Sequence, residues 1–251
     1  MKRITSAQNE YIKKIAKLSS KKHREEQGLF LAEGEHLLQM LDGTDYVIDT
    51  VIMSDGFYEK NGSAYDETVV VPEGIFEKIS DTKSPQGVIA VVGLPQDEQT
   101  IKSGRYIYCD NLQDPGNVGT VIRTADAFGF SGVILSKGSA DVYSSKVIRS
   151  SQGSVFNIDI ICETDIDFLQ KAKEDGFFIT STALYGESVS VKNMQTRADQ
   201  IFVIGNEGSG VSEEILKMSD EIAHIEMFGK AESLNAAVAA SILMYEVSGR
   251  E

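Results

Sequence analysis

The sequence has few of the residues that build disulfides, metal sites and common catalytic triads. Its 251 residues include two cysteines, three histidines and no tryptophan. Cys109 and Cys162 show no Cys-x-x-Cys or Cys/His spacing, which favours two reduced, buried thiols over a disulfide or a metal site. His23, His36 and His224 lack metal or triad spacing, so we expect no metal ligand and no catalytic role among them.

Long hydrophobic runs are also absent. The longest, around Ala236–Tyr245, stops at about ten residues and contains Ser241, whereas a membrane-spanning helix needs roughly 20. The basic start, Met1–Ser6, precedes no apolar stretch, so it predicts no secretory signal. With 41% hydrophobic and 25% charged residues, the composition is that of a folded protein with one large or two smaller domains. We expect a cytoplasmic protein.

Three common phosphate and nucleophile motifs are missing as well. No Gly-x-Gly-x-x-Gly follows the first expected strand of either half, and the chain contains no Gly-x-x-x-x-Gly-Lys-Ser/Thr and no Gly-x-Ser-x-Gly sequence. These absences argue against the dinucleotide-binding, P-loop and serine-hydrolase classes.

The net charge of −14 argues against nucleic-acid binding, because phosphate contacts need lysine and arginine. The distribution of charge points the other way. Residues 1–24 hold eight basic residues and one acidic residue, a local charge of +7, and the remaining chain carries −21. Lys13, Lys17 and Lys21 recur every four residues and can share one face of a continuous helix, unless Ser19-Ser20 break it before Lys21. With Arg24 they form the predicted RNA-contacting set. A solvated lysine-rich helix explains the charge equally well.

The chain divides into two α/β patterns. Short apolar segments alternate with helical patterns over residues 1–94, which predicts a small N-terminal α/β domain whose first helix covers Ser6–Leu18. Residues 95–104 are polar and contain proline and glycine, so we place a linker there. The pattern restarts at Tyr106–Asp110, and strands alternating with helices over 105–251 predict a parallel sheet covered on both faces.

The segment Asp110–Gly129 runs from a strand end through a Pro-Gly turn into a helix. Asn117 fits the N-cap, where its side-chain oxygen would accept a hydrogen bond from a free N–H of the first turn. Arg123 is expected to point away from the apolar stripe, and its small neighbours Gly119 and Thr120 leave space for an anionic ligand. A capped helix with one surface arginine is the alternative interpretation.

In Ile201–Gly210, an apolar strand runs into three glycines around Asn206 and Glu207. Glycines past the carboxyl end of a parallel strand let the backbone approach a ligand closely, and open α/β sheets bind ligands at this edge. We therefore predict a binding loop here, with a purely structural glycine-rich loop as the alternative.

In Ile225–Ala240, a strand ends, a loop passes through Gly229, and an alanine-rich helix follows. Ser233 is the predicted helix cap, and Asn235 is expected beside free backbone N–H groups. The alanines of this helix would let another backbone pack closely. The alternative is a well-capped core helix.

Taken together and in this order, the three segments resemble the three signature motifs of the SpoU (TrmH) family of S-adenosylmethionine-dependent RNA ribose 2′-O-methyltransferases. The resemblance covers about 145 residues, from Tyr106 to the C-terminus. The stretches Ile4-Thr-Ser-x-x-Asn9 and Phe30-x-x-Glu33-Gly34 resemble the substrate-binding domain that precedes the catalytic domain in many members. The resemblance implies a trefoil knot in the C-terminal domain, a homodimer formed through that domain, and RNA, in particular ribosomal RNA, as the partner.

The resemblance also implies roles for individual residues, with S-adenosyl-L-methionine as the cofactor. The catalytic side chains implied are Asn117, Arg123, Glu207, Ser233 and Asn235. The cofactor-binding residues implied are Thr182, Ala183, Gly205, Ile225, Met227 and Leu234. We assign Arg123 to phosphate binding and alkoxide stabilisation, since a guanidinium has no lone pair free to take up a proton and resists acting as a base. Glu226 stands where the third motif commonly has proline, which predicts a less rigid loop.

Two other functions stay open. A base methyltransferase of the same superfamily would share the knot, but the Asn117/Arg123 and Ser233/Asn235 pairs favour ribose chemistry. A non-catalytic RNA-binding or ribosome-assembly protein is the alternative from another class, and the presence of all five implied catalytic side chains argues against it.

Overall fold

The structure, a computed structural model, describes residues 1–95, 100–184 and 187–249. Residues 96–99 of the predicted linker lie outside that description. Within it, no helix is both long enough and apolar enough to cross a membrane.

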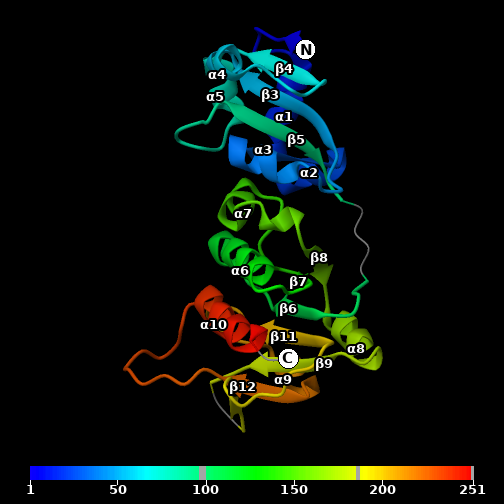
Figure 1. Ribbon diagram of the computed structural model, residues 1–251, viewed down its shortest axis with the longest axis vertical. Helices are drawn as coiled ribbons and strands as arrows, with labels where there is room; N and C mark the ends of the chain where they lie inside the picture. Colours follow the sequence, from blue (N-terminus) through cyan, green and yellow to red (C-terminus); the bar gives the residue numbers. More distant parts are fainter. Residues whose placement is uncertain (96–99, 185–186, 250–251) are drawn as a thin grey trace. The chain divides into compact units, whose positions relative to one another are not determined.

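Contacts divide the chain into two compact units (Figure 1). The first unit holds Met1–Gln96 together with Tyr143–Phe156, and the second holds Asp97–Val142 together with Asn157–Glu251. The segment Tyr143–Phe156, which the sequence analysis assigns to the domain at 105–251, thus groups with the first unit.

The first unit is built on a five-stranded mixed sheet. Its strands are β1 (Lys2–Arg3), β2 (Leu29–Glu33), β3 (Ile48–Ser54), β4 (Thr68–Val71) and β5 (Val88–Gly93). Its helices are α1 (Glu10–Ala16), η1 (Lys17–Ser19), α2 (Lys21–Gln27), α3 (Glu35–Leu41), α4 (Asp55–Asn61), α5 (Glu73–Ile79), α7 (Ser145–Ser151) and η2 (Ser154–Phe156), where η marks a 3-10 helix. The strand order is β1-β4-β3-β5-β2, in which β5 runs antiparallel to β3 and β2.

The first helix, α1, begins directly after its N-cap residue, Asn9. Oδ1 of Asn9 accepts a hydrogen bond from the N–H of Tyr11 at 2.9 Å, so α1 begins after Asn9. Ile12 and Ile15 are buried in the core of this unit. The prediction of a helix within Ser6–Leu18 is confirmed, but its bounds differ. α1 covers only Glu10–Ala16, and the 3-10 helix η1 follows it directly.

The second unit is built on a seven-stranded sheet in which every strand pair is parallel. Its strands are β6 (Arg105–Cys109), β7 (Gly132–Ser136), β8 (Asp159–Thr164), β9 (Phe178–Thr182), β10 (Val189–Ser190), β11 (Gln200–Ile204) and β12 (Glu221–His224). Its helices are α6 (Pro115–Ala127), α8 (Ile166–Glu174), α9 (Glu213–Met218) and α10 (Ala236–Ser248). The strand order is β10-β12-β9-β11-β6-β7-β8. The predicted α/β class with a parallel sheet is confirmed, and the trefoil knot stays a prediction.

Helices cover both faces of this sheet. Leu169 of α8 and Ile215 of α9 pack with Tyr108 and Ile179 in one buried cluster. α6 contacts β6 and β7, and α10 contacts α6 and β11, on the opposite face. The sheet is therefore buried on both sides, which explains why its strands are almost continuously apolar.

The alanine-rich face of α10 packs inside the chain. Ala236, Ala237 and Ala240 are 8%, 3% and 0% exposed. α10 lies against α6, where the hydroxyl oxygens of Thr124 and Ser241 are 3.3 Å apart. The backbone predicted to pack closely against this helix is thus α6 of the same chain.

Candidate active site

Four neighbouring strands of the second sheet end at one edge, and the three motifs begin there. β12, β9, β11 and β6 are adjacent in this order and parallel, so their carboxyl ends lie side by side. The first motif follows β6 at Asp110, the second follows β11 at Gly205, and the third follows β12 at Ile225. Open parallel α/β sheets bind ligands at this edge.

α6 starts with a different cap from the one predicted. The N-cap is Asp114, whose Oδ1 accepts a hydrogen bond from the N–H of Asn117 at 2.9 Å, and Pro115 is the first helical residue. The prediction of Asn117 as the N-cap is wrong, because Pro115 has a φ preset for the first helical turn and Asp114 supplies the capping oxygen. The side chain of Asn117 is therefore available to the other motifs.

A row of side-chain hydrogen bonds joins the three motifs. Nδ2 of Asn235 donates to Oδ1 of Asn117 at 3.0 Å, and Nδ2 of Asn117 donates to Oε1 of Glu207 at 2.8 Å. Oδ1 of Asn235 accepts from the N–H groups of Ala237 and Val238, at 3.0 and 3.2 Å, and so caps α10. All hydrogen bonds of the row are donated in one direction, from Asn235 through Asn117 to Glu207. The direction is fixed because Oδ1 of Asn235 already caps α10 and the carboxylate of Glu207 can only accept. Three of the predicted catalytic residues, one from each motif, are thus brought together.

Glu207 ends this row as a hydrogen-bonded carboxylate. Its oxygens also accept from the backbone N–H of Asp114 at 3.3 Å and of Gln113 at 3.5 Å. Partial burial tends to raise the pKa of Glu207, but the amide of Asn117 and these N–H groups together hold that pKa below its ordinary value. Glu207 is therefore an anion at neutral pH.

The second motif folds into a closed loop. Asn206 and Gly210 exchange two backbone hydrogen bonds, at 3.1 and 3.0 Å, and Nδ2 of Asn206 donates to the carbonyl of Asn111 at 2.7 Å. A Cβ added to Gly205 would lie 2.1 Å from the backbone nitrogen of Val211. The packing of the loop itself therefore requires glycine at 205. This agrees with the alternative interpretation of the segment as a structural glycine-rich loop.

Three polar residues at this edge are not among the site residues predicted from the sequence. Asp114 caps α6, Asn111 receives the amide of Asn206, and Oδ2 of Asp110 accepts from the N–H of Ser212 at 2.8 Å. The Asp-Pro pair was a signal for the cap. The contacts of Asn111 depend on its φ of +53°, which no local sequence pattern indicates.

Arg123 lies on the outer face of α6. Val121, Ile122 and Ala125 are buried, and Arg123 is exposed, as the helical period predicts. It lies on the same helix as Asn117, the middle member of the row.

Ser233 and Leu234 precede α10 and are exposed. The prediction of Ser233 as the helix cap is wrong, because Asn235 fills that position with two hydrogen bonds. The hydroxyl of Ser233 therefore lies in a loop, two residues before the row.

Most of the predicted cofactor-binding residues lie at the same edge of the sheet, and Met227 and Leu234 lie in the loop between β12 and α10. Thr182 is the last residue of β9, and its Oγ1 donates to the carbonyl of Val203 at 3.0 Å. The N–H of Ala183 donates to the carbonyl of Ala223 at 3.0 Å. These two bonds hold the end of β9 between β11 and β12.

Apolar side chains accompany these strand ends. Ile225 and Met227 are half-buried, and Leu234 is 37% exposed. Partly exposed apolar side chains beside polar strand ends suit a ligand that carries both apolar and polar groups. The residues present therefore fit S-adenosylmethionine.

Glu226 is tied to the neighbouring chain segment. Nζ of Lys192 donates to Oε2 of Glu226 at 2.8 Å, and this bond lowers the pKa of the carboxyl. Both side chains are exposed to solvent, which screens their attraction, so the ion pair contributes little to stability. The loop that lacks the family's proline thus has a weak electrostatic tie, and its predicted lower rigidity stays a prediction.

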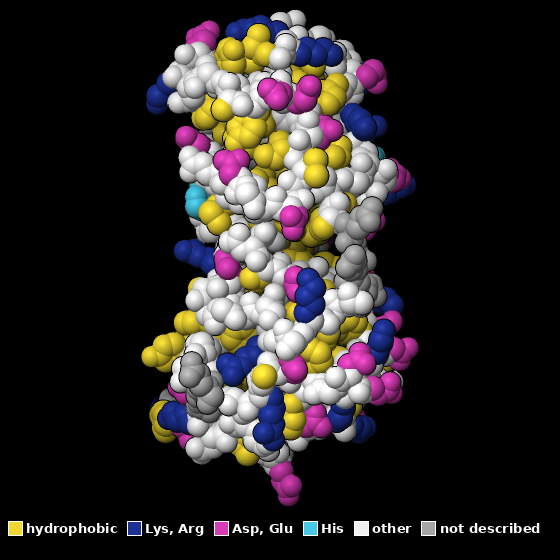
Figure 2. Space-filling model, turned by 45° about the vertical axis from the view of Figure 1, so that its right-hand side comes forward, with side chains coloured by type: hydrophobic (Ala, Val, Ile, Leu, Met, Phe, Trp, Pro, Cys, Tyr) yellow, Lys and Arg dark blue, Asp and Glu magenta, His cyan; other side chains and the backbone are white. Residues whose placement is uncertain are grey.

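The predicted RNA-contacting lysines are exposed but do not share one helix. Lys13 lies on α1, Lys17 on η1 and Lys21 on α2, and Ser20 between them is extended (φ −95°, ψ 133°). Lys13 pairs with Glu10 at 2.9 Å. Ser20 interrupts the helix before Lys21, so of the two alternatives that the sequence leaves open for these lysines, the broken helix is the one present. On the face drawn in Figure 2, basic and acidic side chains are interspersed.

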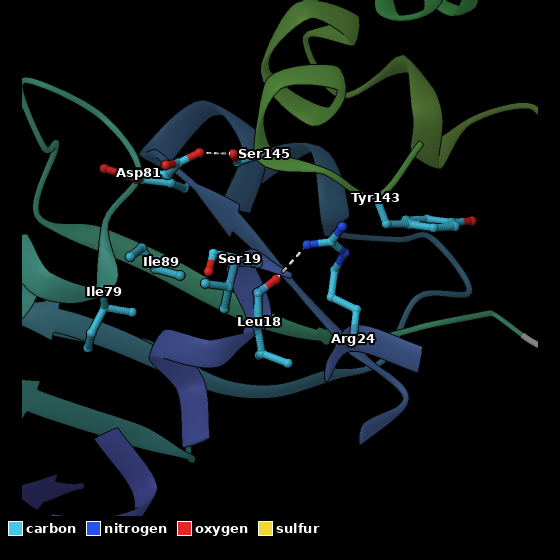
Figure 3. A pocket seen from close by; sticks show the side chains of 10 residues that line it. Leu18, Ser19, Arg24, Ile79, Asp81, Ile89, Tyr143 and Ser145 are labelled. Carbon is cyan, nitrogen blue, oxygen red and sulfur yellow. Dashed lines mark hydrogen bonds between the residues drawn. The ribbon is translucent and has the colours of Figure 1, made fainter. Parts of the chain in front are cut away.

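Arg24 does not belong to the exposed basic set. Its side chain is buried, 4% exposed, and Nη1 donates to the carbonyl of Leu18 at 2.6 Å (Figure 3). It lines a cavity of about 30 Å³, room for one water, together with Glu33, Tyr143 and other residues. Its burial contradicts the predicted RNA contact, because the guanidinium is used inside the first unit.

Comparison with known proteins decides the family. Residues 104–245 match the SpoU rRNA Methylase family, and residues 9–90 match the MRM3-like substrate binding domain. The chain belongs to the SpoU rRNA Methylase family. The resemblance inferred from the three motifs is confirmed.

Full-length relatives of this SpoU chain include proteins from several bacteria. The Bacillus subtilis 23S rRNA (guanosine(2553)-2′-O)-methyltransferase RlmP is 34% identical over 250 residues, covering 99% of this chain and 100% of the relative. An AdoMet-bound rRNA methyltransferase from Sinorhizobium meliloti has a TM-score of 0.87 and 31% identity, covering 97% of this chain and 96% of that one. The SpoU methyltransferase AviRb from Streptomyces viridochromogenes, in complex with AdoMet, has a TM-score of 0.86 and 25% identity, covering 97% and 98%.

Proposed function

We propose that this chain transfers a methyl group from S-adenosylmethionine to a ribose 2′-hydroxyl of ribosomal RNA in the cytoplasm. The hydrogen-bonded row Asn235–Asn117–Glu207 carries the proposal, because it joins the three family motifs at the ligand-binding edge of the sheet. The full-length similarity to RlmP supports the substrate class and the position of the methyl group.

The cofactor would lie at the ends of β9, β11 and β12. Ile225, Met227 and Leu234 would hold its apolar parts, and backbone groups around Thr182 and Gly205 its polar parts. When bound, S-adenosylmethionine supplies an electrophilic methyl group that needs no activation by the protein. The chain must therefore position the 2′-hydroxyl and handle its proton.

Arg123 is the proposed binder of the phosphate next to the target ribose. Its guanidinium is exposed on α6 and would stabilise the oxygen as it becomes an alkoxide. Ser233, in the loop before Asn235, would meet the RNA from the side of the third motif.

Glu207 is proposed to position the site and not to accept the proton. Its lowered pKa makes it a weak base, and its oxygens already accept hydrogen bonds from Asn117, Asp114 and Gln113. By holding Asn117 against Asn235, it fixes the start of α6 relative to the loop that carries Ser233.

The first unit is proposed to bind the RNA through its exposed lysines. Lys13, Lys17 and Lys21, in the segment of charge +7, would attract phosphate that the acidic remainder of the chain repels. The match to a substrate binding domain over residues 9–90 supports this assignment. Arg24 is not part of the proposed RNA contact.

We also propose a homodimer through the second unit. Val238 and Tyr245 are 47% and 67% exposed, and their seven-residue separation places them on one face of α10. An exposed apolar stripe of this kind suits contact with a second copy. Changing both residues to aspartate should yield a monomer in sedimentation velocity. A double variant that sediments like the unchanged protein would place the subunit contact elsewhere.

The function is tested with purified protein, in vitro transcribed 23S rRNA and methyl-labelled S-adenosylmethionine. We expect label at a ribose, seen as one internucleotide linkage that resists alkaline hydrolysis, and loss of labelling in Asn117→Ala. Label on a base would favour the base methyltransferase. RNA binding without any label on 23S rRNA or on total RNA from a deletion strain would favour the non-catalytic alternative.

A further inference from the structure

Phe228 is an aromatic side chain left in solvent. It is 91% exposed, the highest value among the large hydrophobic side chains of the described residues. It lies between β12 and α10, in the loop 225–235, which reaches away from the sheet (Figure 1). An aromatic ring that buries nothing in its own chain is available to a partner.

The loop that carries Phe228 is anchored at both ends within the candidate active site. At its start, Glu226 pairs with Lys192 at 2.8 Å, two residues before the aromatic ring. At its end, Asn235 caps α10 and donates to Asn117. Phe228 is therefore presented from a loop whose two ends belong to the third motif.

The surroundings of Phe228 favour a nucleobase over a protein surface. The residues that follow it, Gly229, Lys230, Ala231 and Glu232, are all exposed, and two of them are charged. The buried centre of a protein interface is depleted of charged residues, whereas single-stranded nucleic acid is bound by an aromatic ring for the base and nearby cations for the backbone. Lys230 is such a cation, and it is nearer to Phe228 in sequence than the exposed acid Glu232; the charge of Glu226 is balanced by Lys192.

We propose that Phe228 stacks on a nucleobase of the substrate RNA beside the methylated ribose, and that Lys230 contacts the adjoining phosphate backbone. This inference rests on the proposed function and adds to it a residue that selects unpaired RNA. An unpaired nucleotide can turn its base onto an aromatic ring, whereas a base inside an A-form helix is already stacked. The target ribose is therefore expected in a loop or bulge.

The absence of tryptophan from the chain allows a direct measurement. Phe228→Trp places a single indole at the proposed contact, and titration with in vitro transcribed 23S rRNA should quench its fluorescence. Phe178→Trp is the matched control, because Phe178 starts β9 at the opposite edge of the same sheet. Its fluorescence should change little under the same titration.

Two further variants separate stacking from electrostatic attraction. Phe228→Ala should weaken RNA binding about tenfold and raise KM for RNA, with an unchanged dependence of log affinity on log salt, because a base–aromatic stack carries no charge. Lys230→Gln should lower that log–log slope by about 0.7, the value for one phosphate contact on a single strand. The dissociation constant for S-adenosylmethionine should stay the same in both.

Several results would overturn the proposal. Unquenched Phe228→Trp fluorescence in RNA-bound protein would exclude stacking, and weaker S-adenosylmethionine binding by Phe228→Ala would assign the ring to the cofactor. An indole signal that changes with protein concentration in the absence of RNA would assign it to a second copy. If the unchanged protein methylates 23S rRNA while Phe228→Ala keeps its full kcat/KM, this inference fails and the proposed function stands.

Discussion

Arg24 in the first unit and Arg123 in the second are both predicted from the sequence to meet RNA, yet they lie in opposite environments. Arg24 is 4% exposed and donates to the carbonyl of Leu18, whereas Arg123 is exposed on α6. The lengths of their helices explain the difference. α6 has 13 residues, enough for its apolar stripe to set the direction of Arg123. α2 has seven residues and follows a break at Ser20, so the helical period of the lysines before the break does not extend to Arg24.

Removing Arg123 should have the largest effect on activity. Arg123→Ala is expected to lower kcat by about 10²-fold or more, the size seen when a stabiliser of transition-state charge is lost. The affinity for S-adenosylmethionine and the midpoint of urea unfolding should stay unchanged, because the side chain is exposed. Single-turnover methylation of 23S rRNA measures the first quantity, and equilibrium titration and unfolding measure the others.

Lys217→Ala is the matched control for Arg123, since Lys217 is another exposed basic residue of the second unit. It should keep full turnover. Normal turnover of Arg123→Ala would mean that the exposed arginine is only part of a capped surface helix, the alternative that the sequence leaves open.

Removing Arg24 should affect folding more than RNA binding. Arg24→Ala deletes a buried charge-assisted hydrogen bond to Leu18 and leaves a carbonyl with one partner fewer, which costs roughly 2 kcal/mol. Urea unfolding should show this loss for Arg24→Ala and less than about 0.5 kcal/mol for the exposed neighbour Lys22→Ala. A stable Arg24→Ala protein with a reduced salt dependence of RNA binding would reverse our assignment.

The same contrast explains which features of the fold the sequence predicts well. The buried parallel strands of the second unit, such as Arg105–Cys109 and Gln200–Ile204, are continuous apolar runs between polar loops, and the α/β class follows from them. The grouping of Tyr143–Phe156 with the first unit has no comparable signal. It depends on contacts between residues distant in sequence, such as the rings of Phe30 and Tyr143, whose centroids lie 5.0 Å apart.

The candidate site shows the same limit at the level of single side chains. The motifs identify Asn117, Glu207 and Asn235, and the strand order explains why these residues meet. The sequence pattern assigns the caps to Asn117 and Ser233, but Asp114 and Asn235 fill them. A cap depends on where the first helical turn closes, and several nearby polar side chains can each fit that position in sequence.

Reversing the charge of the exposed lysines should change RNA binding without changing the site. Changing Lys13, Lys17 and Lys21 to glutamate should lower the log–log salt slope by about 0.7–0.9 for each phosphate that the variant no longer binds. Filter binding of 23S rRNA at several salt concentrations measures the slope. The affinity for S-adenosylmethionine should be unchanged, because its proposed site lies in the second unit.

The matched control for this variant has the same net charge. Lys60, Lys78 and Lys83 are exposed in the first unit outside residues 1–24, and their change to glutamate adds the same negative charge. An equal decrease of slope in both triple variants would show that net charge, and not the N-terminal segment, governs RNA attraction.

The smallest effect is expected at Glu207, where the second unit keeps a carboxylate within a hydrogen-bonded row. The pKa of Glu207 is lower in the folded protein than its ordinary value of 4.5, so its ionised form stabilises the fold above about pH 4.5, and that contribution is lost as the pH falls through the folded pKa. Glu207→Gln should therefore be less stable than the unchanged protein at pH 7, and the difference should shrink on acidification below pH 4.5. Because Glu207 is exposed, the difference in free energy of unfolding should stay small.

The matched control is Glu232→Gln, which removes an exposed carboxylate from the loop before α10. Its stability relative to the unchanged protein should show no such dependence on pH. A difference between Glu207→Gln and the unchanged protein that is constant with pH would mean that the row depends on the shape of the side chain and not on its charge.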